Sequence, residues 1–238
     1  MPEKDLNPSP DAMAIDARVA AVEARDVVRT FEIGDNRIEV LKGVSLTVQR
    51  GEKLFLVGPS GAGKTSLLYT LAGLESPNEG EVFVNGRSLY RLGRRQQAGV
   101  RNGTMGYVFQ SFFLLPELTA LENVMVPALI RGRPAKERAR GLLERVGLAE
   151  RTGHLPNELS GGEQQRVAIA RSLINDPAII FADEPTGNLD TKTGESVMRL
   201  LMSLADEHDR TLLVVTHDHS LAGVGDRKVT LVDGRIVD

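Results

Sequence analysis

The chain of 238 residues contains no cysteine, so disulfide bonds and thiolate metal sites are excluded, which fits a reducing compartment. Long hydrophobic runs are also absent. The apolar stretches at 179–182 and 212–215 are far shorter than the roughly 18 to 20 residues of a membrane-spanning helix, so we expect no transmembrane segment. The first residues lack the basic start and apolar run of a secretory signal, and we expect residues 1–20 to form a flexible tail.

Neither sign of charge is in large excess, since 29 Lys and Arg stand against 32 Asp and Glu, a net charge of -3. This balance gives no reason to expect nucleic acid as a partner. Basic residues nevertheless cluster at Arg87, Arg91, Arg94, Arg95 and Arg101. A solvated face is the first interpretation of this cluster, and contact with lipid headgroups or nucleic acid is the alternative.

Strand and helix patterns alternate along the chain. Residues 21–48 alternate in polarity, which predicts short antiparallel strands, and compact apolar runs at 53–57, 179–182 and 211–215 predict buried strands. Residues from about 88 to 165 are Arg-rich and mostly helical in pattern, although 105–109 reads as a strand. We therefore expect an α/β fold over residues 21–238, with a central mostly parallel sheet, an antiparallel β region and a helical insertion subdomain at about 88–165.

A glycine-rich string, GPSGAGKT, follows the strand at 53–57 and opens a helix. Glycines let backbone N–H groups close around a phosphate at the positive end of a helix dipole, Lys64 can neutralise phosphate oxygens, and Thr65 offers a hydroxyl to Mg²⁺. A plain strand-to-helix turn would explain the glycines but not Lys followed by Thr at this spacing. The predicted nucleotide-binding residues are Gly58, Pro59, Ser60, Gly61, Ala62, Gly63, Lys64, Thr65 and Ser66.

Two carboxylates follow the apolar run at 179–182, at the strand end where parallel sheets collect ligands. Asp183 is expected to hold Mg²⁺ through water, and Glu184 to polarise the water that attacks the γ-phosphate of ATP. The alternative is a strand followed by an acidic helix cap before Pro185.

A second glycine pair occurs in the string Ser160, Gly161, Gly162, Glu163. Ser at the cap and Glu three residues later form a capping box, which is one sufficient explanation. Two glycines in a first turn are poor helix formers, costing about 1 kcal/mol each against Ala, and they favour close approach of a phosphate to the backbone. Capping and phosphate contact are compatible.

In this order the motifs resemble those of ABC transporter ATPase subunits, and the resemblance covers residues from about 22 to 238. It implies ATP and Mg²⁺ as cofactors and a head-to-tail homodimer, in which Ser160, Gly161, Gly162 and Glu163 of one subunit close on ATP held by the other. It also implies further roles. These are Gln110 as a lid residue at the metal, with Thr65 and Asp183; His217 as a γ-phosphate contact; Asp190 in the dimer loop; and Phe31 as the adenine-stacking residue.

Within that family, the strings VFQSFFLLPELTALENV, LSGGEQQRVAIARSL and DEPTGNLD look most like the branch of lipoprotein-release (LolD), macrolide-exporter and FtsE cell-division ATPases. The resemblance implies a separate membrane permease, lipoprotein release as the task, and a peripheral position on the cytoplasmic face of the cell membrane. The alternatives are an FtsE-like regulator, a macrolide-type exporter ATPase, a soluble ABC ATPase acting on DNA or ribosomes, and, more distantly, a P-loop kinase.

The apolar run at 112–116 follows the lid residue Gln110, and four of the ten aromatic residues fall between Tyr107 and Phe113. These side chains either fill the core of the insertion or form a groove that receives a helix of the membrane partner.

Overall fold

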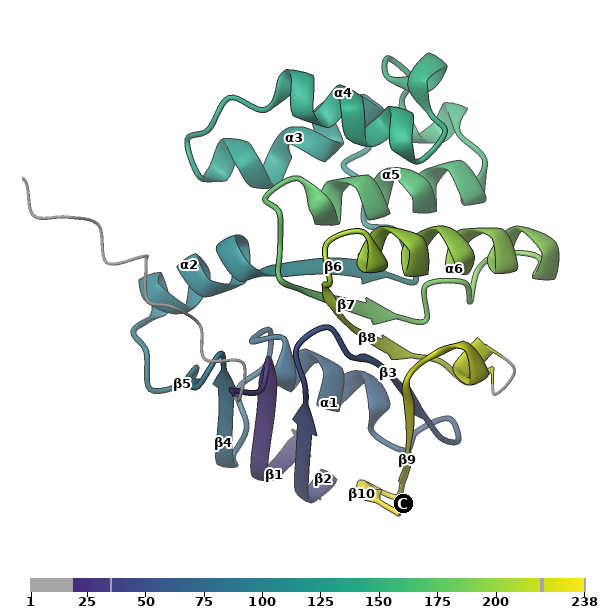
Figure 1. Ribbon diagram of the computed structural model, residues 1–238. Helices are drawn as coiled ribbons and strands as arrows, with labels where there is room; N and C mark the ends of the chain where they lie inside the picture. The colour runs from purple at the N-terminus through teal and green to yellow at the C-terminus, as the bar shows by residue number, and fades with distance from the viewer. Residues whose placement is uncertain (1–18, 35, 219–220, 238) are drawn as a thin grey trace, which may run out of the picture.

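Two β-sheets form the framework of the protein, seen in a computed structural model that describes residues 19–34, 36–218 and 221–237 (Figure 1). An antiparallel sheet has the strand order β2-β1-β4-β5, and a six-stranded sheet has the order β10-β9-β3-β8-β7-β6. The first comprises β1 (Val22–Ile33), β2 (Asn36–Val48), β4 (Glu79–Val84) and β5 (Arg87–Ser88). The second comprises β3 (Lys53–Val57), β6 (Met105–Phe109), β7 (Ile179–Asp183), β8 (Thr211–Val215), β9 (Arg227–Val232) and β10 (Arg235–Ile236).

Helices make the crossover connections that parallel strands require. Strands β3, β6, β7, β8 and β9 are parallel to one another, while β10 runs antiparallel to β9. The α-helices are α1 (Lys64–Leu71), α2 (Arg94–Thr104), α3 (Ala120–Ile130), α4 (Lys136–Arg145), α5 (Gly161–Leu173) and α6 (Thr191–Asp206). Short 3-10 helices occupy Ala149–Arg151, Pro156–Glu158 and Leu221–Val224.

The two faces of the six-stranded sheet bury separate cores. On β3, Leu54 and Leu56 pack with α1 and the antiparallel sheet, while Phe55 and Val57 pack with the layer that contains α3 to α6. This division follows from the two-residue period of a strand, which sends successive side chains to opposite faces. Figure 1 shows the consequence, since α1 lies on one side of the sheet and α5 and α6 lie on the other.

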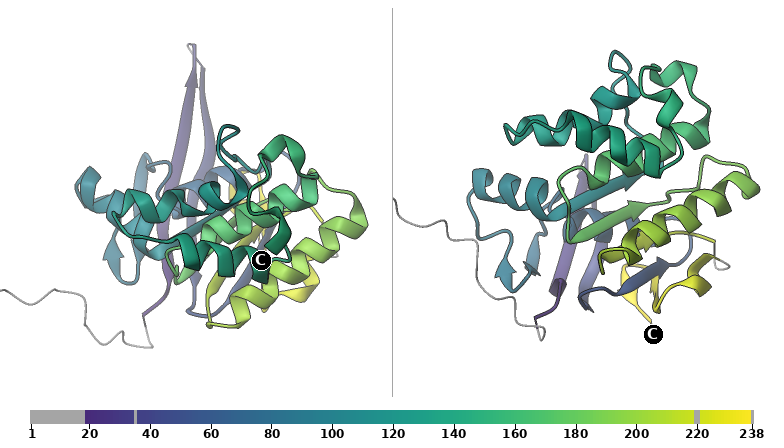
Figure 2. Two further views of the ribbon diagram at one scale, coloured as in Figure 1. Left: turned by 90° about the horizontal axis from the view of Figure 1, so that it is seen from above. Right: turned by 45° about the horizontal axis from the view of Figure 1, so that its top comes forward.

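The β1–β2 hairpin projects well beyond the rest of the molecule (Figure 2). Its strands pair from Val22 with Val48 to Ile33 with Asn36, with register irregularities between Ala24 and Thr30. Asp35, between β1 and β2, lies outside the described residues. The antiparallel region expected from the alternating sequence is therefore present.

The α/β fold and its predicted strands agree with the structure, but the range 88–165 is more mixed than its composition indicated. It contains β6, which pairs with β7 from Met105 and Ile179 to Phe109 and Asp183. Only the part after Phe109, with α3 and α4, lies in the outer helical layer (Figure 1). The division into subdomains remains a prediction, and residues 1–18 of the expected tail lie outside the described residues.

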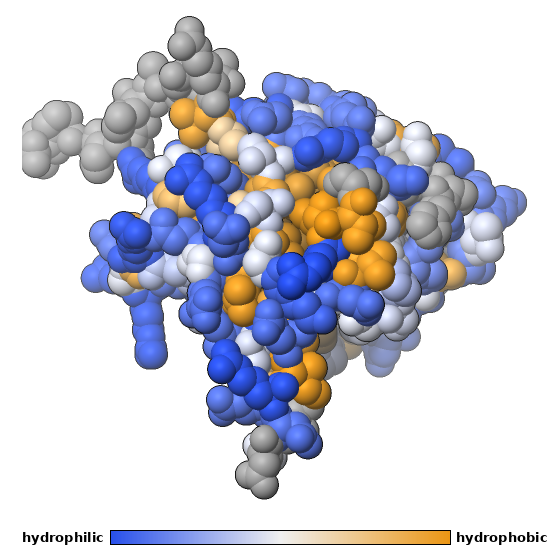
Figure 3. Space-filling view, turned by 90° about the horizontal axis from the view of Figure 1, so that it is seen from below, coloured by the Kyte–Doolittle hydropathy of each residue, from blue (hydrophilic) through white to orange (hydrophobic). Residues whose placement is uncertain are grey.

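The face seen from below is mostly hydrophilic, with a cluster of hydrophobic residues near its middle (Figure 3). Larger exposed apolar side chains occur at Ile38, Leu74, Phe113, Leu115, Leu129, Ile130, Val224 and Val237. Within the described residues, no helix has the length and apolar character needed to cross a membrane.

Candidate functional site

The glycine-rich loop joins β3 to α1 at the carboxyl edge of the sheet. Gly58, Gly61 and Gly63 have φ angles of 147°, 78° and 99°, which favour glycine. A Cβ at Gly58 would lie 2.0 Å from the carbonyl oxygen of Leu231, whereas one at Gly61 would have no heavy atom within 4 Å. The loop therefore packs closely against β9 at Gly58, while Gly61 in its middle has free space around it.

Lys64 begins α1 and is only 8% exposed. Its ammonium donates hydrogen bonds to the carbonyl oxygens of Gly58 and Pro59, each at 2.9 Å. The loop therefore curls around the charged end of the lysine. Ser60 is exposed, Ala62 is buried and Ser66 is half-buried in the first turn of the helix.

Thr65 and Asp183 bring the loop and β7 together. The hydroxyl of Thr65 donates to Oδ1 of Asp183 at 3.0 Å. Burial raises the pKa of Asp183, while hydrogen bonds from Thr65 and Tyr69 and the charge of Lys64 oppose that rise. Asp183 is 7% exposed, so it is a desolvated carboxylate facing a hydroxyl at the end of a strand. Such an oxygen pair suits a hard divalent cation.

Glu184 has a φ of 45°, and its backbone N–H donates to the carbonyl oxygen of Val215 at 2.9 Å. Its Oε2 lies 2.7 Å from Nδ1 of His217, which follows β8. The Glu184 side chain is 16% exposed and that of His217 is 69% exposed. The left-handed backbone turns the carboxylate toward the histidine at the open edge of the sheet.

Gln110 follows β6 and forms a reciprocal pair with Asn188. The Gln110 side chain donates to Oδ1 of Asn188 at 3.2 Å, and Nδ2 of Asn188 donates to the backbone oxygen of Gln110 at 3.0 Å. A Cβ at Gly187 would lie 2.7 Å from Nε2 of Gln110, so a larger residue there would displace the end of the Gln110 side chain. Gln110 is thus tied to the loop that leads to Asp190.

Ser160 and Glu163 form the predicted capping box of α5. The Ser160 hydroxyl accepts from the backbone N–H of Glu163, and the Glu163 carboxylate accepts from the backbone N–H of Ser160 at 2.8 Å and from its hydroxyl at 2.7 Å. These bonds, together with Arg151, hold the pKa of Glu163 below its ordinary value. Glu163 therefore has a complete structural role within its own chain.

Gly161 and Gly162 have packing partners that the sequence did not disclose. A Cβ at Gly162 would lie 2.6 Å from Cγ2 of Thr193, and one at Gly161 would lie 3.3 Å from Cδ2 of Leu189. Asp190 caps α6 by accepting from the backbone N–H of Thr193 at 3.1 Å, and its hydrogen bonds with Thr193 lower its pKa. The start of α5 thus packs on the loop and helix that follow Glu184.

Phe31 lies on β1, apart from these groups. The Arg29 guanidinium stands 4.5 Å from the centre of its ring, and both residues line a cavity of about 480 Å³ with Arg37 and Asn78. No residue of the glycine-rich loop lines that cavity. β2 connects the two places, because Ile38 pairs with Phe31 and a Cβ at Gly63 would lie 2.8 Å from the carbonyl oxygen of Val40.

Two contributors were missed by sequence reasoning. Tyr69 reaches Asp183 from one turn beyond Thr65, a spacing of four residues that places both on one face of α1. Gln165 is fully buried and its amide donates to the backbone oxygen of Pro185 at 2.7 Å, which links α5 to the residue after Glu184. The helical spacing could have found Tyr69, but no local pattern points to Gln165.

Comparison with known proteins agrees with this arrangement. A family model described as ABC transporter matches residues 41–187. A Thermotoga maritima protein called an uncharacterized ABC transporter ATP-binding protein is 51% identical over 218 residues, covering 90% of this chain and 93% of its own length. The lipoprotein-releasing system ATP-binding protein LolD of Shewanella frigidimarina is 47% identical over 218 residues, covering 90% of this chain and 91% of its own length.

A solved structure is similarly close. The ATP-binding cassette MJ0796, described as dimeric, post-hydrolysis and bound to ADP and Pi, matches with a TM-score of 0.85 and 42% identity over 91% of this chain and 97% of that one. The fold, the strand-loop-helix at Lys64 and the paired carboxylates of β7 all fit one protein class. The chain belongs to the ABC transporter family, as an ATP-binding subunit whose ATP hydrolysis is coupled to transport.

Proposed function

We propose that the chain works as a head-to-tail homodimer around two Mg-ATP and drives a separate membrane permease that releases lipoproteins from the cell membrane. The observation that carries this proposal is the meeting of Thr65 with Asp183, and of Glu184 with His217, at one edge of the parallel sheet. A buried carboxylate beside a hydroxyl, next to a second carboxylate beside an imidazole, provides separate groups for a metal and for a water.

The phosphates of ATP fit the glycine-rich loop. Gly61 has open space where a side chain would stand, so backbone N–H groups are accessible to an anion there. Lys64 already lies inside the loop, with two of its donors held by carbonyl oxygens of the same loop. An anion that competes for this ammonium gains a charge-assisted hydrogen bond, which is stronger than a neutral one.

Mg²⁺ fits the oxygen donors of Thr65, Asp183 and Gln110. Thr65 lies in the first turn of α1, Asp183 ends β7 and Gln110 follows β6, all at the same sheet edge. When bound, Mg²⁺ would neutralise phosphate charge. Asp183 stays charged more readily beside a cation, because a nearby positive charge opposes the burial that raises its pKa. Gln110 is held by Asn188, so its approach to a metal depends on the loop that contains Asp190.

Glu184 and His217 are assigned to the hydrolytic step. Glu184 would accept a hydrogen bond from the attacking water, and His217 would both orient Glu184 and contact the γ-phosphate. The side chain of His217 is 69% exposed, which leaves it accessible to a ligand from solvent.

The signature residues 160–163 are assigned to the nucleotide of the partner subunit. Helix α5 covers the opposite face of the sheet from α1, and its first turn packs on Leu189 and Thr193 instead of on the glycine-rich loop (Figure 1). The dimeric structures of MJ0796 support a second copy as the place where these residues act.

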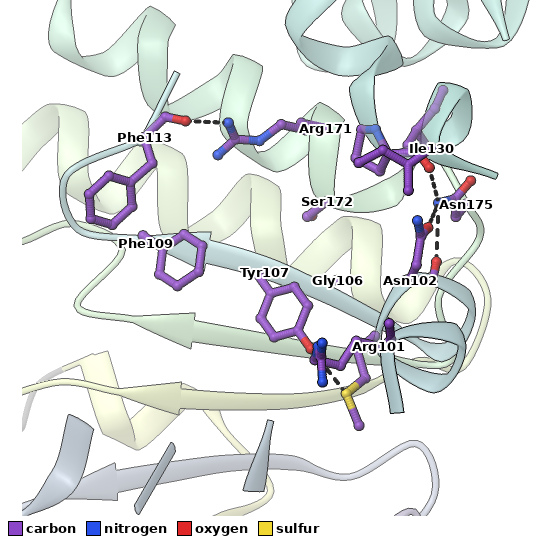
Figure 4. Close-up of a pocket in the computed structure, with 14 residues that line it drawn as sticks. Arg101, Asn102, Gly106, Tyr107, Phe109, Phe113, Ile130, Arg171, Ser172 and Asn175 are labelled. Carbon is purple, nitrogen blue, oxygen red and sulfur yellow. Dashed lines mark hydrogen bonds between the residues drawn. The ribbon is translucent and has the colours of Figure 1, made fainter. Parts of the chain in front are cut away.

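A groove beside the lid residue is assigned to a permease helix. It encloses about 440 Å³ and is lined by Tyr107, Phe109, Phe113, Pro127, Ile130 and Arg171, among others (Figure 4). Phe112 and Phe113 have φ angles of 58° and 46°, and Arg171 donates hydrogen bonds to both of their carbonyl oxygens. This strained segment leaves Phe113 61% exposed, as a large apolar anchor for an apolar helix.

Lipoprotein release is favoured over other tasks by the LolD proteins to which the chain is similar, including those of Shewanella frigidimarina and Myxococcus xanthus at 47% and 49% identity. A permease partner places the subunit on the cytoplasmic face of the cell membrane. Cargo is determined by the permease, so identification of that partner tests the proposal.

The test is purification of tagged Glu184→Gln with Mg-ATP from gently solubilised native membranes, followed by mass spectrometry. We expect a permease with a large extracytoplasmic domain that also holds lipoprotein. A partner bound to cell-wall hydrolases would replace lipoprotein release with an FtsE-like role, and recovery of ribosomes or DNA without membrane protein would contradict the permease. Tagged Lys64→Ala provides the control, because it should not hold the ATP-dependent complex.

A further inference from the structure

Positive charge is concentrated in two segments of the chain that contain no acidic residue. Residues 87–116 and 123–136 include no Asp or Glu, although the chain has 32 of them. The rest of the chain has more acidic than basic groups, so these two segments are where positive charge is in excess. The basic residues are Arg87, Arg91, Arg94, Arg95, Arg101, Arg131, Arg133 and Lys136.

The two segments lie side by side in the fold. A Cβ at Gly103, near the end of α2, would lie 3.4 Å from the guanidinium of Arg131, which follows α3. The side chain of Asn175 joins both segments, since it donates to the backbone oxygens of Asn102 and Pro127, each at 3.1 Å (Figure 4). The end of α2 therefore lies against the α3–α4 turn, and the start of α2 is on the same side of the molecule as that turn (Figures 1 and 2).

Four arginines define this surface, which we call the basic face: Arg94, Arg95, Arg131 and Arg133. All four are exposed, and within the described part of the chain none of them has an ion pair or a side-chain hydrogen bond. Other arginines nearby do have partners, since Arg91 pairs with Glu81 and Arg138 lies 3.8 Å from Asp176.

Arg94 and Arg95 are placed where they oppose the stability of their own helix. They occupy the first turn of α2, which has no acidic residue, at the positive end of the helix dipole. A basic pair at this position is unfavourable for folding, and among the described residues no ion pair or side-chain hydrogen bond offsets it. Arg94 and Arg95 do not stabilise α2, so binding of an external anion would account for their presence at this position.

Bulky apolar side chains immediately precede one of these arginines, Arg131. Leu129 and Ile130, at the end of α3 and immediately before Arg131, are 56% and 73% exposed. Arginines beside exposed aliphatic side chains suit a lipid surface, where headgroups carry negative charge and the region below them is apolar. A nucleic-acid backbone would use the charges but not the aliphatic side chains.

We propose that the basic face binds anionic phospholipid headgroups directly, as a membrane contact separate from the permease. The orientation of the basic face toward the membrane rests on the proposed function. Ile130 also lines the groove assigned to the permease helix, so a permease bound in that groove would turn the basic face toward the bilayer. The contact would hold the groove toward the membrane before and during assembly.

The test measures sedimentation of the full chain with vesicles of phosphatidylcholine mixed with phosphatidylglycerol, and with vesicles of phosphatidylcholine alone. We expect binding only to the anionic vesicles, weakening as salt rises. The variant Arg94→Gln/Arg95→Gln/Arg131→Gln/Arg133→Gln should bind at least about tenfold more weakly, from a few-fold loss per removed charge. A matched variant, Arg145→Gln/Arg199→Gln/Lys228→Gln/Arg235→Gln, loses the same charge from other faces and should bind like the native chain.

Three outcomes would overturn the proposal. The first is no binding to anionic vesicles, and the second is an equal loss of binding in the two charge variants. The third is binding of duplex DNA as tight as binding of anionic vesicles, with Ile130→Gln changing neither affinity. The Arg94→Gln/Arg95→Gln pair should melt no lower than the native chain, which separates lipid binding from a structural role. Because no permease is present, a negative result leaves the proposed function intact, and ATPase activity measured in parallel reports on that function.

Discussion

Substitution of Gly162 distinguishes two reasons for a glycine at this position, close packing against Thr193 and close approach of a phosphate to the backbone. A Cβ there would lie 2.6 Å from Cγ2 of Thr193, closer than real Cβ contacts allow. Overpacking of this kind costs about 1 to 3 kcal/mol, and Ala in place of Gly returns up to about 1 kcal/mol of helix propensity. Gly162→Ala should therefore lose about 1 to 2 kcal/mol of unfolding free energy, which lowers the melting temperature by about 2 to 8 °C in a domain of this size.

The control and the rescue use neighbouring residues. Gly161→Ala meets the flexible end of the Leu189 side chain at 3.3 Å and the Phe112 ring at an ordinary 3.8 Å, so its melting temperature should change little. Thr193→Ser removes the clashing methyl group, so the double variant Gly162→Ala/Thr193→Ser should recover the melting temperature of Thr193→Ser alone.

The ATPase activity of the double variant then shows whether Gly162 is also needed for hydrolysis. If the backbone of Gly162 approaches the phosphate of ATP on a partner subunit, the double variant stays impaired in hydrolysis although its stability is restored. Recovery of both stability and activity would refute that reasoning and leave only a packing role. A single variant as stable as the native chain would refute the predicted clash with Thr193.

Further predictions concern the nucleotide, the base and pH. Lys64→Ala should weaken ATP binding about 10- to 100-fold in calorimetric titration, because a charged hydrogen bond is lost, and unchanged affinity would count against the phosphate loop. Phe31→Ala should weaken ATP binding about two- to tenfold while Phe31→Tyr does not, and equal affinities of all three chains would exclude stacking. Asp176 accepts from Arg210 at 2.7 Å, which lowers its pKa in the folded chain. Its stabilisation is complete above the ordinary value of 3.8 and is lost as pH falls through the lowered value, so Asp176→Asn should be less stable at neutral pH, and chemical denaturation should find the difference shrinking in acid.

The positions of the glycine-rich loop and of Asp183 could be predicted because the patterns that indicate them are local; their roles toward ATP and Mg²⁺ remain predictions. A strand, a glycine-rich turn and Lys64 occupy consecutive residues, and Asp183 ends an apolar run that needs no partner to be recognised. Likewise, the capping box at Ser160 depends on residues three apart.

The connections between these motifs could not be predicted, because they join residues distant in sequence. Gln110 and Asn188 are 78 residues apart, and their reciprocal hydrogen bonds arise only when β6 and β7 become neighbours. The contact of Gly162 with Thr193 similarly depends on the packing of α5 against α6. The strand at 105–109 could be predicted, but the bounds of the insertion at about 88–165 rested on composition, which does not show that this strand joins the central sheet.

The measurement that tests the central claim most directly is the mass of Glu184→Gln in solution, by size exclusion with light scattering, with and without saturating Mg-ATP. The account predicts an ATP-dependent dimer that hydrolyses little, since Glu184 beside His217 is assigned to the water and not to nucleotide binding. The double variant Lys64→Ala/Glu184→Gln should remain monomeric. A Glu184→Gln chain that stays monomeric with saturating Mg-ATP would contradict a site completed by a second copy.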